Sequence, residues 1–262
     1  MNYVAPFCFC CLLFLMSIAN GCSPTSRKTA PPERVQEAAA PAYQVDPLTA
    51  GSITGMIRYV GKRPLPKKID MSGDPACVEA HHGNALDESL VVSSKGGLAN
   101  AFVYVRSGLE GKTFATPSTP VALDQNGCWF RPRVLGIQTN QVLRITNSDP
   151  VTHSIHPMAQ INREWNHSQG AGEPPLARKF AGVEVMMHVK CNIHSWMQAY
   201  IGVVDNPYFA VSGEDGSYRI GNLPPGIYNV AIWQEKLGTQ EQQVTLAPHS
   251  NTQVDVTFKG TN

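Results

Sequence analysis

Hydrophobic and polar residues alternate with a period of two along much of the chain beyond residue 50. Glycine, proline, asparagine and aspartate separate these runs, for example in the stretches EDG, LPPG and NSDP. Such alternation is typical of β-strands with one buried face, and little helical periodicity is present. The pattern predicts strands over residues 52–60, 98–106, 120–125, 142–148, 183–191, 199–205, 216–223, 227–235, 242–246 and 252–259. Many short strands at this spacing indicate an all-β protein made of Greek-key β-sandwiches.

The first residues form an apolar run, from Val4 to Ile18, that ends in small residues. The run is too short to span a membrane comfortably, and it predicts an export signal over residues 1–21. The stretch IANG before Cys22 resembles the lipobox of bacterial lipoproteins, in which the cysteine carries the lipid. An ordinary cleavage site at Ala-Asn-Gly is the alternative. Both interpretations predict export to the periplasm or cell envelope, and the lipobox interpretation also predicts a membrane anchor.

Residues 22–50 are rich in proline and alanine and contain almost no large apolar residues. Because such a segment cannot bury enough surface to fold, we expect a disordered tether. A flexible chain of this length spans roughly 30 Å on average, which would lift the folded part clear of a membrane.

Length and charge narrow the classes of function. The chain has 262 residues, enough for two domains. Charged residues make up only 16% of the sequence and the formal net charge is +1. No basic field is available for nucleic acid, so we expect no nucleic-acid partner.

Three of the seven cysteines lie in the export signal, and a fourth is Cys22. The other three are Cys77, Cys128 and Cys191. In an oxidising compartment the simplest pairing joins Cys77 to Cys128, contributing about 4 kcal/mol, and leaves Cys191 for other chemistry. Two buried thiols are the alternative, and Cys77 with the two histidines that follow it is a further candidate metal cluster.

The stretch GEDGSYRIGNLPPGIYNVAIWQE resembles the carboxypeptidase regulatory-like, or transthyretin-like, module, which has an Asp-Gly turn and a Leu-Pro-Pro-Gly-x-Tyr corner. The segments ITGMIRYVGKRPLPKK and LANAFVYV resemble the first strands of the same module. The resemblance implies one split sandwich, residues 51–112 and 206–260, with a second sandwich, residues 113–205, inserted between its halves. It implies a fold and no activity.

The inserted stretch carries the motif CNIHSWM, in which Cys191, His194 and Met197 are three positions apart. With His153, which follows the strand end NSD, these residues resemble the cupredoxins, the small blue copper proteins, in their amicyanin-like or plastocyanin-like form. The resemblance implies a Greek-key sandwich with one type 1 copper ion held by these four side chains. Such an ion requires a thiolate and two imidazoles in one plane with a weak axial thioether. The loop ligands converge only if the strand stops at Cys191 and the chain curls around the metal.

Other metal sites fit these residues less well. A structural zinc site usually has a second close pair of ligands, which is missing. The stretch HSIH offers His156 as the alternative to His153. The His-Cys-His triplet of multicopper oxidases and copper nitrite reductases is absent, so we expect no enzymatic turnover. Ser154 stands where cupredoxins usually have an asparagine that ties the two ligand loops together.

The cupredoxin resemblance implies single-electron transfer to a redox partner protein, with copper as the cofactor. Partners of cupredoxins dock near the edge of the downstream histidine. Trp196, beside His194, is therefore a candidate docking residue, and packing of the ligand loop is its alternative role. Copper storage or delivery would use the same ligands. A surface scaffold or adhesion module with an incidental metal site is a third function, and it rests on the transthyretin-like module alone.

Overall fold

The computed structural model describes residues 42–260. The predicted export signal, the predicted lipidation at Cys22 and most of the predicted tether lie outside these residues. Within them, no helix is long and apolar enough to cross a membrane. The described chain consists of β-strands and one short helix, so the predicted all-β class is confirmed.

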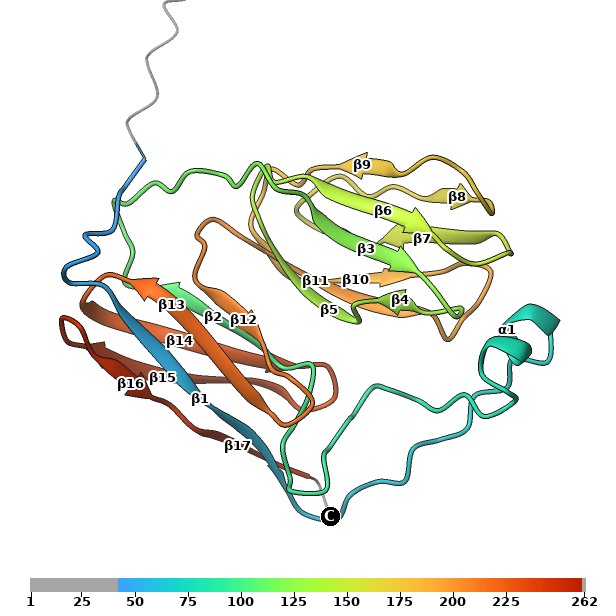
Figure 1. Ribbon diagram of the computed structural model, residues 1–262, viewed down its shortest axis with the longest axis horizontal. Coiled ribbons are helices and arrows are strands. Elements are labelled where there is room, and N and C mark those ends of the chain that lie inside the picture. Colours follow the sequence, from blue (N-terminus) through green and yellow to red (C-terminus); the bar gives the residue numbers. More distant parts are fainter. Residues whose placement is uncertain (1–41, 261–262) are drawn as a thin grey trace, which may run out of the picture. The chain divides into compact units, whose positions relative to one another are not determined.

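One β-sandwich, called the first sandwich, contains the blue strand, the dark orange to red strands and β2 of Figure 1. One of its sheets consists of β1 (Gly51–Val60), β13 (Ser217–Leu223), β16 (Asn251–Gln253) and β17 (Val256–Lys259). The other sheet consists of β2 (Phe102–Ser107), β12 (Phe209–Val211), β14 (Gly226–Gln234) and β15 (Gly238–Leu246). Fully buried side chains such as Ile57, Val103 and Val230 form the core of this sandwich.

The strands of the first sandwich follow local signals in the sequence. Buried and exposed side chains alternate along the start of β13. The Asp-Gly turn before it requires glycine, because Gly216 has a φ of +86° and an added Cβ would lie 2.3 Å from the Ile57 carbonyl oxygen. At the LPPG corner the Tyr228 hydroxyl donates a hydrogen bond to the Pro224 carbonyl oxygen at 2.5 Å. These contacts fix the turn and the corner quoted from the sequence.

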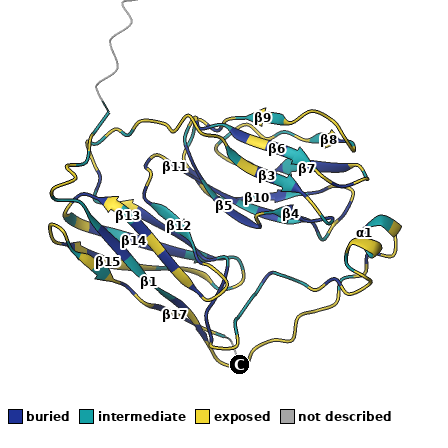
Figure 2. Ribbon diagram, viewed as in Figure 1, coloured by how far each residue is buried: buried dark blue, intermediate teal, exposed yellow. Residues whose placement is uncertain are grey.

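The second sandwich contains the middle of the chain, drawn in green to light orange in Figure 1. Its larger sheet consists of β5 (Val134–Gln138), β7 (His153–Pro157), β8 (His167–Gln169), β10 (Glu184–Lys190) and β11 (Gln198–Val204). Its smaller sheet consists of β3 (Val121–Gln125), β4 (Phe130–Arg131), β6 (Leu143–Asn147) and β9 (Leu176–Arg178). Figure 2 shows that most of the residues of β5, β7 and β10 are buried or half-buried. The core of this sandwich contains Cys191 and Met197 beside Ile155 and Val189.

Strand pairing groups β1 and β2 with β12 to β17, although β3 to β11 lie between them in the sequence. The predicted domains, residues 51–112 with 206–260 and residues 113–205, group the strands in the same way. Their exact limits stay a prediction. A small apolar cluster contains residues of both sandwiches, namely Phe102 of β2 with Val134 and Val204 of the second sandwich.

The structure contains elements that the sequence pattern does not predict. They include β4, β8, β9 and β12, which have only two or three residues. They also include β5 and β7, which are buried along most of their length and therefore do not alternate. The helix α1 (Pro75–Ala80) has six residues, too few for helical periodicity. Its start carries ordinary signals, since Asp74 Oδ1 accepts the Ala76 N–H at 3.0 Å and Pro75 is the first helical residue.

The predicted tether extends too far toward the first sandwich. In the structure the Tyr43 N–H donates to the Thr113 carbonyl oxygen at 2.6 Å, and Val45 packs against the core. Residues 42–50 therefore belong with the sandwich, because Tyr43 and Val45 supply the apolar contacts that the composition of the whole segment conceals.

Candidate metal centre

The motif CNIHSWM forms the tight loop between β10 and β11. Strand β10 ends at Lys190, one residue before Cys191, and β11 begins at Gln198, one residue after Met197. The Cys191 N–H donates to the Met197 carbonyl oxygen at 3.1 Å, and the Met197 N–H donates to the His194 carbonyl oxygen at 3.0 Å. These two bonds turn the chain back on itself and bring the Cys191 and His194 side chains together, with Sγ 4.0 Å from His194 Nδ1.

His153 reaches this loop from β7, which pairs with β10 in the same sheet. His153 Nδ1 lies 2.9 Å from His194 Nδ1, and His194 Nδ1 lies 4.0 Å from Cys191 Sγ. The donor atoms of the three residues all lie within 4.8 Å of one another. The structure thus brings three of the four predicted ligands to one buried point.

The outer nitrogens of both imidazoles face carboxylates. His153 Nε2 lies 2.8 Å from Asp149 Oδ2, and His194 Nε2 lies 3.1 Å from Asp74 Oδ2. A carboxylate accepts a hydrogen bond from a ring N–H, so each ring holds a hydrogen on its outer nitrogen. In both histidines Nδ1 then faces the interior of the site.

The surroundings of Cys191 favour its thiolate. Burial raises the pKa of the thiol, but hydrogen bonds from His153 and from three backbone N–H groups outweigh burial and lower the pKa to about 6. These N–H groups belong to Ser154, Ile193 and His194 and lie 3.3, 3.4 and 3.3 Å from Sγ. Burial lowers the pKa of His153, but Asp149 and Cys191 raise it to about 9. These contacts favour a thiolate on Cys191 and a proton on His153. A metal ion bound there would take the place of that proton.

Ser154 links the two ligand segments. Its hydroxyl oxygen accepts the Asn192 N–H at 2.6 Å, and its own N–H donates to Cys191 Sγ at 3.3 Å. The serine therefore makes a connection of the kind expected of the asparagine that it replaces.

His156, the alternative first ligand, lies away from the thiolate. Its Nδ1 is 3.2 Å from Asn192 Oδ1, and its Nε2 is 2.5 Å from Glu164 Oε1. His153 is fully buried, whereas His156 is half-buried at the edge of the site. Of the two histidines of HSIH, His153 is the one that faces Cys191.

Met197 lies in the core of the second sandwich, and Trp196 packs against the same core. Met197 is fully buried in the core cluster that also contains Cys191. The Trp196 ring packs on His194 with centroids 5.1 Å apart, and its Nε1 donates to the Cys128 carbonyl oxygen at 3.2 Å. These contacts pack the ligand loop, and a docking role for Trp196 stays a prediction.

Cys77 and Cys128 form a disulfide. Cys191 is the free cysteine of the described chain. Asp149 accepts the backbone N–H groups of Gly127 at 2.6 Å and Cys128 at 2.8 Å, so the disulfide is tied to the carboxylate that holds His153. Cys77 is oxidised in this bond and has no thiol. The candidate metal cluster of Cys77 and the two histidines that follow it in the sequence therefore has no thiolate ligand.

The sequence interpretation missed the two carboxylates of the site. Asp149 lies in the quoted stretch NSDP, four residues before His153, and that spacing to a candidate ligand is a usable local signal. Asp74 is separated from His194 by 120 positions and has no such signal. The only local sequence signal at Asp74 is that of a helix N-cap.

The donor set fits copper. A thiolate, two imidazoles and a nearby thioether are the ligands of mononuclear electron-transfer copper sites. A structural zinc site would use four strong nitrogen or sulfur ligands, and the other two described cysteines are joined to each other. His153, Cys191, His194 and Met197 are therefore the residues that would hold the ion.

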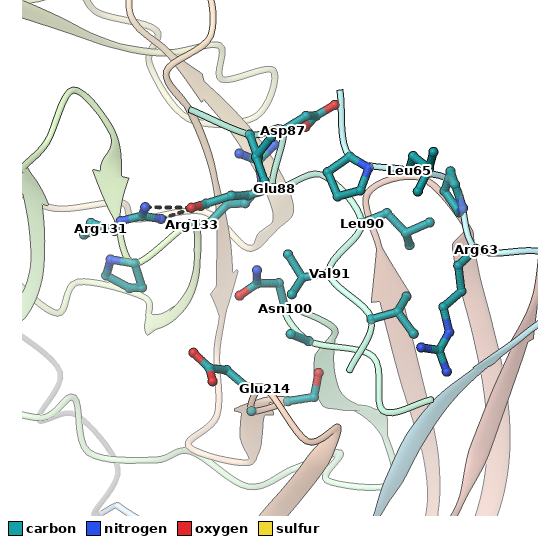
Figure 3. A pocket seen from close by; sticks show the side chains of 18 residues that line it. Arg63, Leu65, Asp87, Glu88, Leu90, Val91, Asn100, Arg131, Arg133 and Glu214 are labelled. Atoms are coloured by element: carbon teal, nitrogen blue, oxygen red, sulfur yellow. Dashed lines mark hydrogen bonds and ion pairs between the residues drawn. The ribbon is translucent and has the colours of Figure 1, made fainter. Parts of the chain in front are cut away.

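A separate cavity of about 890 Å³ contains none of the predicted ligands. Figure 3 shows Arg131 in its wall, paired with Glu88 at 2.8 Å. Arg133, also in the wall, pairs with Glu235 at 2.7 Å. Because the lining contains no histidine, cysteine or methionine, the cavity does not offer the donor set of the metal centre.

No known protein family matches the sequence, and no curated protein matches it. Solved structures match part of the chain, and they include the following three. A copper-containing nitrite reductase from Thermus scotoductus is 21% identical over 38% of this chain, which spans only 26% of the reductase, with a TM-score of 0.32. A purple cupredoxin from Nitrosopumilus maritimus is 18% identical over 32% of this chain and 98% of its own, with a TM-score of 0.27. A Cu(I) amicyanin with a methionine changed to alanine is 14% identical over 38% of this chain and 97% of its own, with a TM-score of 0.29.

Proposed function

We propose that this protein is a mononuclear copper protein that transfers single electrons. The observation that carries the proposal is the buried group formed by Cys191, His153 and His194, whose donor atoms lie within 4.8 Å of one another. A copper ion held there supplies a one-electron couple between Cu(I) and Cu(II). The cupredoxin-like motif of the sequence supports the same function.

The side chains of the site have separate roles in this proposal. Cys191 supplies a thiolate that backbone N–H groups stabilise. His153 and His194 supply imidazoles whose orientation is set by carboxylates. Met197 supplies a thioether from the buried end of the loop. None of the four is more than 4% exposed, so the site excludes water and holds its ligands in one arrangement.

We place the protein outside the cytoplasm, anchored through lipid on Cys22, with a redox protein as its partner and no substrate turnover of its own. Copper storage or delivery remains the alternative function. A carrier must release its metal, and the burial of all the donors favours retention. Exchange with a Cu(I) chelator separates the two, because an electron-transfer protein keeps its copper through many redox cycles.

The first test is the visible spectrum of the purified protein after addition of Cu(II). We expect an intense charge-transfer band in the native protein, since a thiolate bound to Cu(II) absorbs in the visible. Cys191→Ser should abolish the band. Met197→Leu should keep both the copper and the band while raising the reduction potential, because Met197 would supply a weak thioether donor that stabilises Cu(II) more than Cu(I).

His156→Ala is the matched control, since this histidine lies beside the site and faces Asn192 and Glu164. It should leave the band unchanged, whereas His153→Ala should weaken or shift it. Absence of an intense band from the native protein, or loss of copper from Met197→Leu as complete as from Cys191→Ser, contradicts the proposed function.

A further inference from the structure

A segment between β1 and β2 covers the metal centre. Residues 68–85, called the cap segment, contain helix α1, and their flanking strands both belong to the first sandwich. The Cys77–Cys128 disulfide attaches the cap segment to the second sandwich. His81 makes a second attachment, with its Nε2 2.6 Å from the Gly127 carbonyl oxygen. The cap segment is thus attached to the second sandwich at two neighbouring residues, Gly127 and Cys128.

The cap segment places one carboxylate directly on a candidate copper ligand. Asp74 Oδ2 lies 3.1 Å from His194 Nε2, and Cys77 Sγ lies 4.0 Å from the same nitrogen. The other oxygen, Asp74 Oδ1, accepts the Ala76 N–H that starts α1. The helix cap therefore fixes the carboxylate while its free oxygen faces the imidazole.

This contact changes the surroundings of the downstream histidine. The sequence resemblance predicts that a partner docks near the edge of that ring. Here the outer nitrogen of His194 faces Asp74, Trp196 packs on the ring, and the residue is only 4% exposed. The edge of His194 is covered by this chain itself.

Building on the proposed copper function, we propose that Asp74 is a positioning residue that orients His194 and lowers the reduction potential of the site. A carboxylate that accepts the outer N–H of an imidazole makes the ring a stronger donor. Its negative charge also stabilises Cu(II) more than Cu(I), because the oxidised ion has the larger positive charge. Asp149 makes the same contact with His153, so each imidazole has a carboxylate behind it.

The chain offers variants that separate this effect from the helix cap. Asp74→Asn keeps an oxygen for the Ala76 N–H, since asparagine and aspartate cap helices about equally well, but it removes the charge. Asp74→Ser also caps a helix and is too short to reach His194. Asp70→Asn is the matched control, because this exposed carboxylate of the cap segment bonds the Ser72 N–H at 2.9 Å.

The experiment measures Cu(I) and Cu(II) affinities by chelator competition, and the reduction potential by spectroelectrochemistry, on the full-length protein. We expect Asp74→Asn and Asp74→Ser to raise the ratio of Cu(I) to Cu(II) affinity about tenfold, which corresponds to a rise of about 59 mV in potential. Asp70→Asn should leave the potential near the native value, because an exposed charge is screened. Thermal unfolding of the metal-free variants checks that the fold is intact.

Equal potentials for the native protein and both Asp74 variants overturn the role of Asp74 and leave the copper function standing. Loss of copper from both folded Asp74 variants also overturns it, because Asp74 would then be needed for binding rather than for the potential. A native protein that binds no copper instead refutes the proposed function. The measurements therefore distinguish the two failures.

Discussion

Glu184 is the buried carboxylate at the first position of β10, and it organises the loop that follows β7, the strand of His153. It accepts the Gln160 N–H at 2.6 Å and the Asn162 N–H at 2.9 Å. Burial raises the pKa of Glu184, but these hydrogen bonds outweigh burial and hold the pKa below that of an unperturbed glutamate. The carboxylate therefore contributes stability above the unfolded-state pKa of about 4.3, and the contribution is lost as the pH falls through the lower pKa of the folded state.

We predict that Glu184→Gln lowers the free energy of unfolding at neutral pH by about 1.5–3 kcal/mol, the usual contribution of hydrogen bonds to a charged group. Because the variant no longer has the carboxylate, its stability should also fall less steeply in acid. Urea denaturation between pH 3 and pH 7 measures both effects. Glu214→Gln, at an exposed position, is the control, and a variant as stable as this control would show that Glu184 does not hold the loop.

At the scale of elements, the cap segment depends on its disulfide. The bond joins residues separated by 51 positions, so the chain-entropy model assigns it about 4 kcal/mol. We predict that the double variant Cys77→Ala with Cys128→Ala loses about this much stability in urea denaturation. Limited proteolysis should then cut residues 68–85 first, because a six-residue helix has little stability of its own. Cleavage of the native protein and the variant at the same rate would contradict the prediction.

At the scale of the whole molecule, a buried ion pair joins the two sandwiches. Arg133 precedes β5 of the second sandwich and Glu235 follows β14 of the first, and their side chains are only 6% and 5% exposed. Arg133 Nε donates to Glu235 Oε2 at 2.7 Å and Arg133 Nη2 donates to Oε1 at 3.0 Å. Removing one partner leaves the other charge buried and unpaired.

We predict that Arg133→Met alone destabilises the protein by about 3–5 kcal/mol and that Arg133→Met with Glu235→Met costs less than the single change. A double-mutant cycle of unfolding free energies measures the coupling. Additive effects of the two substitutions would mean that the pair is not formed in solution. Arg144→Met, at an exposed position of β6, is the control for loss of an arginine.

The sequence by itself determined the strands that are long enough to alternate and the residues that carry the chemistry. Each of the ten predicted segments overlaps an observed strand, because burial of one face repeats every two residues within a single segment. The Cys-x2-His-x2-Met spacing likewise depends only on neighbouring residues, and the loop between β10 and β11 is built from it. The short strands β4, β8 and β9 carry too few residues for such a signal, and pairing with their neighbours defines them.

The tertiary structure decided which histidine faces Cys191 and which carboxylates contact the candidate ligands. The choice of His153 over His156 depends on which residue of β7 faces Cys191 across the sheet. The carboxylate on His194 comes from Asp74, and the carboxylate on His153 is held by the disulfide loop at Cys128. Contacts of this kind join segments that are remote in sequence, and they exist only after the chain has folded and the cap segment has been fastened to the second sandwich. No local pattern of polar and apolar residues records them.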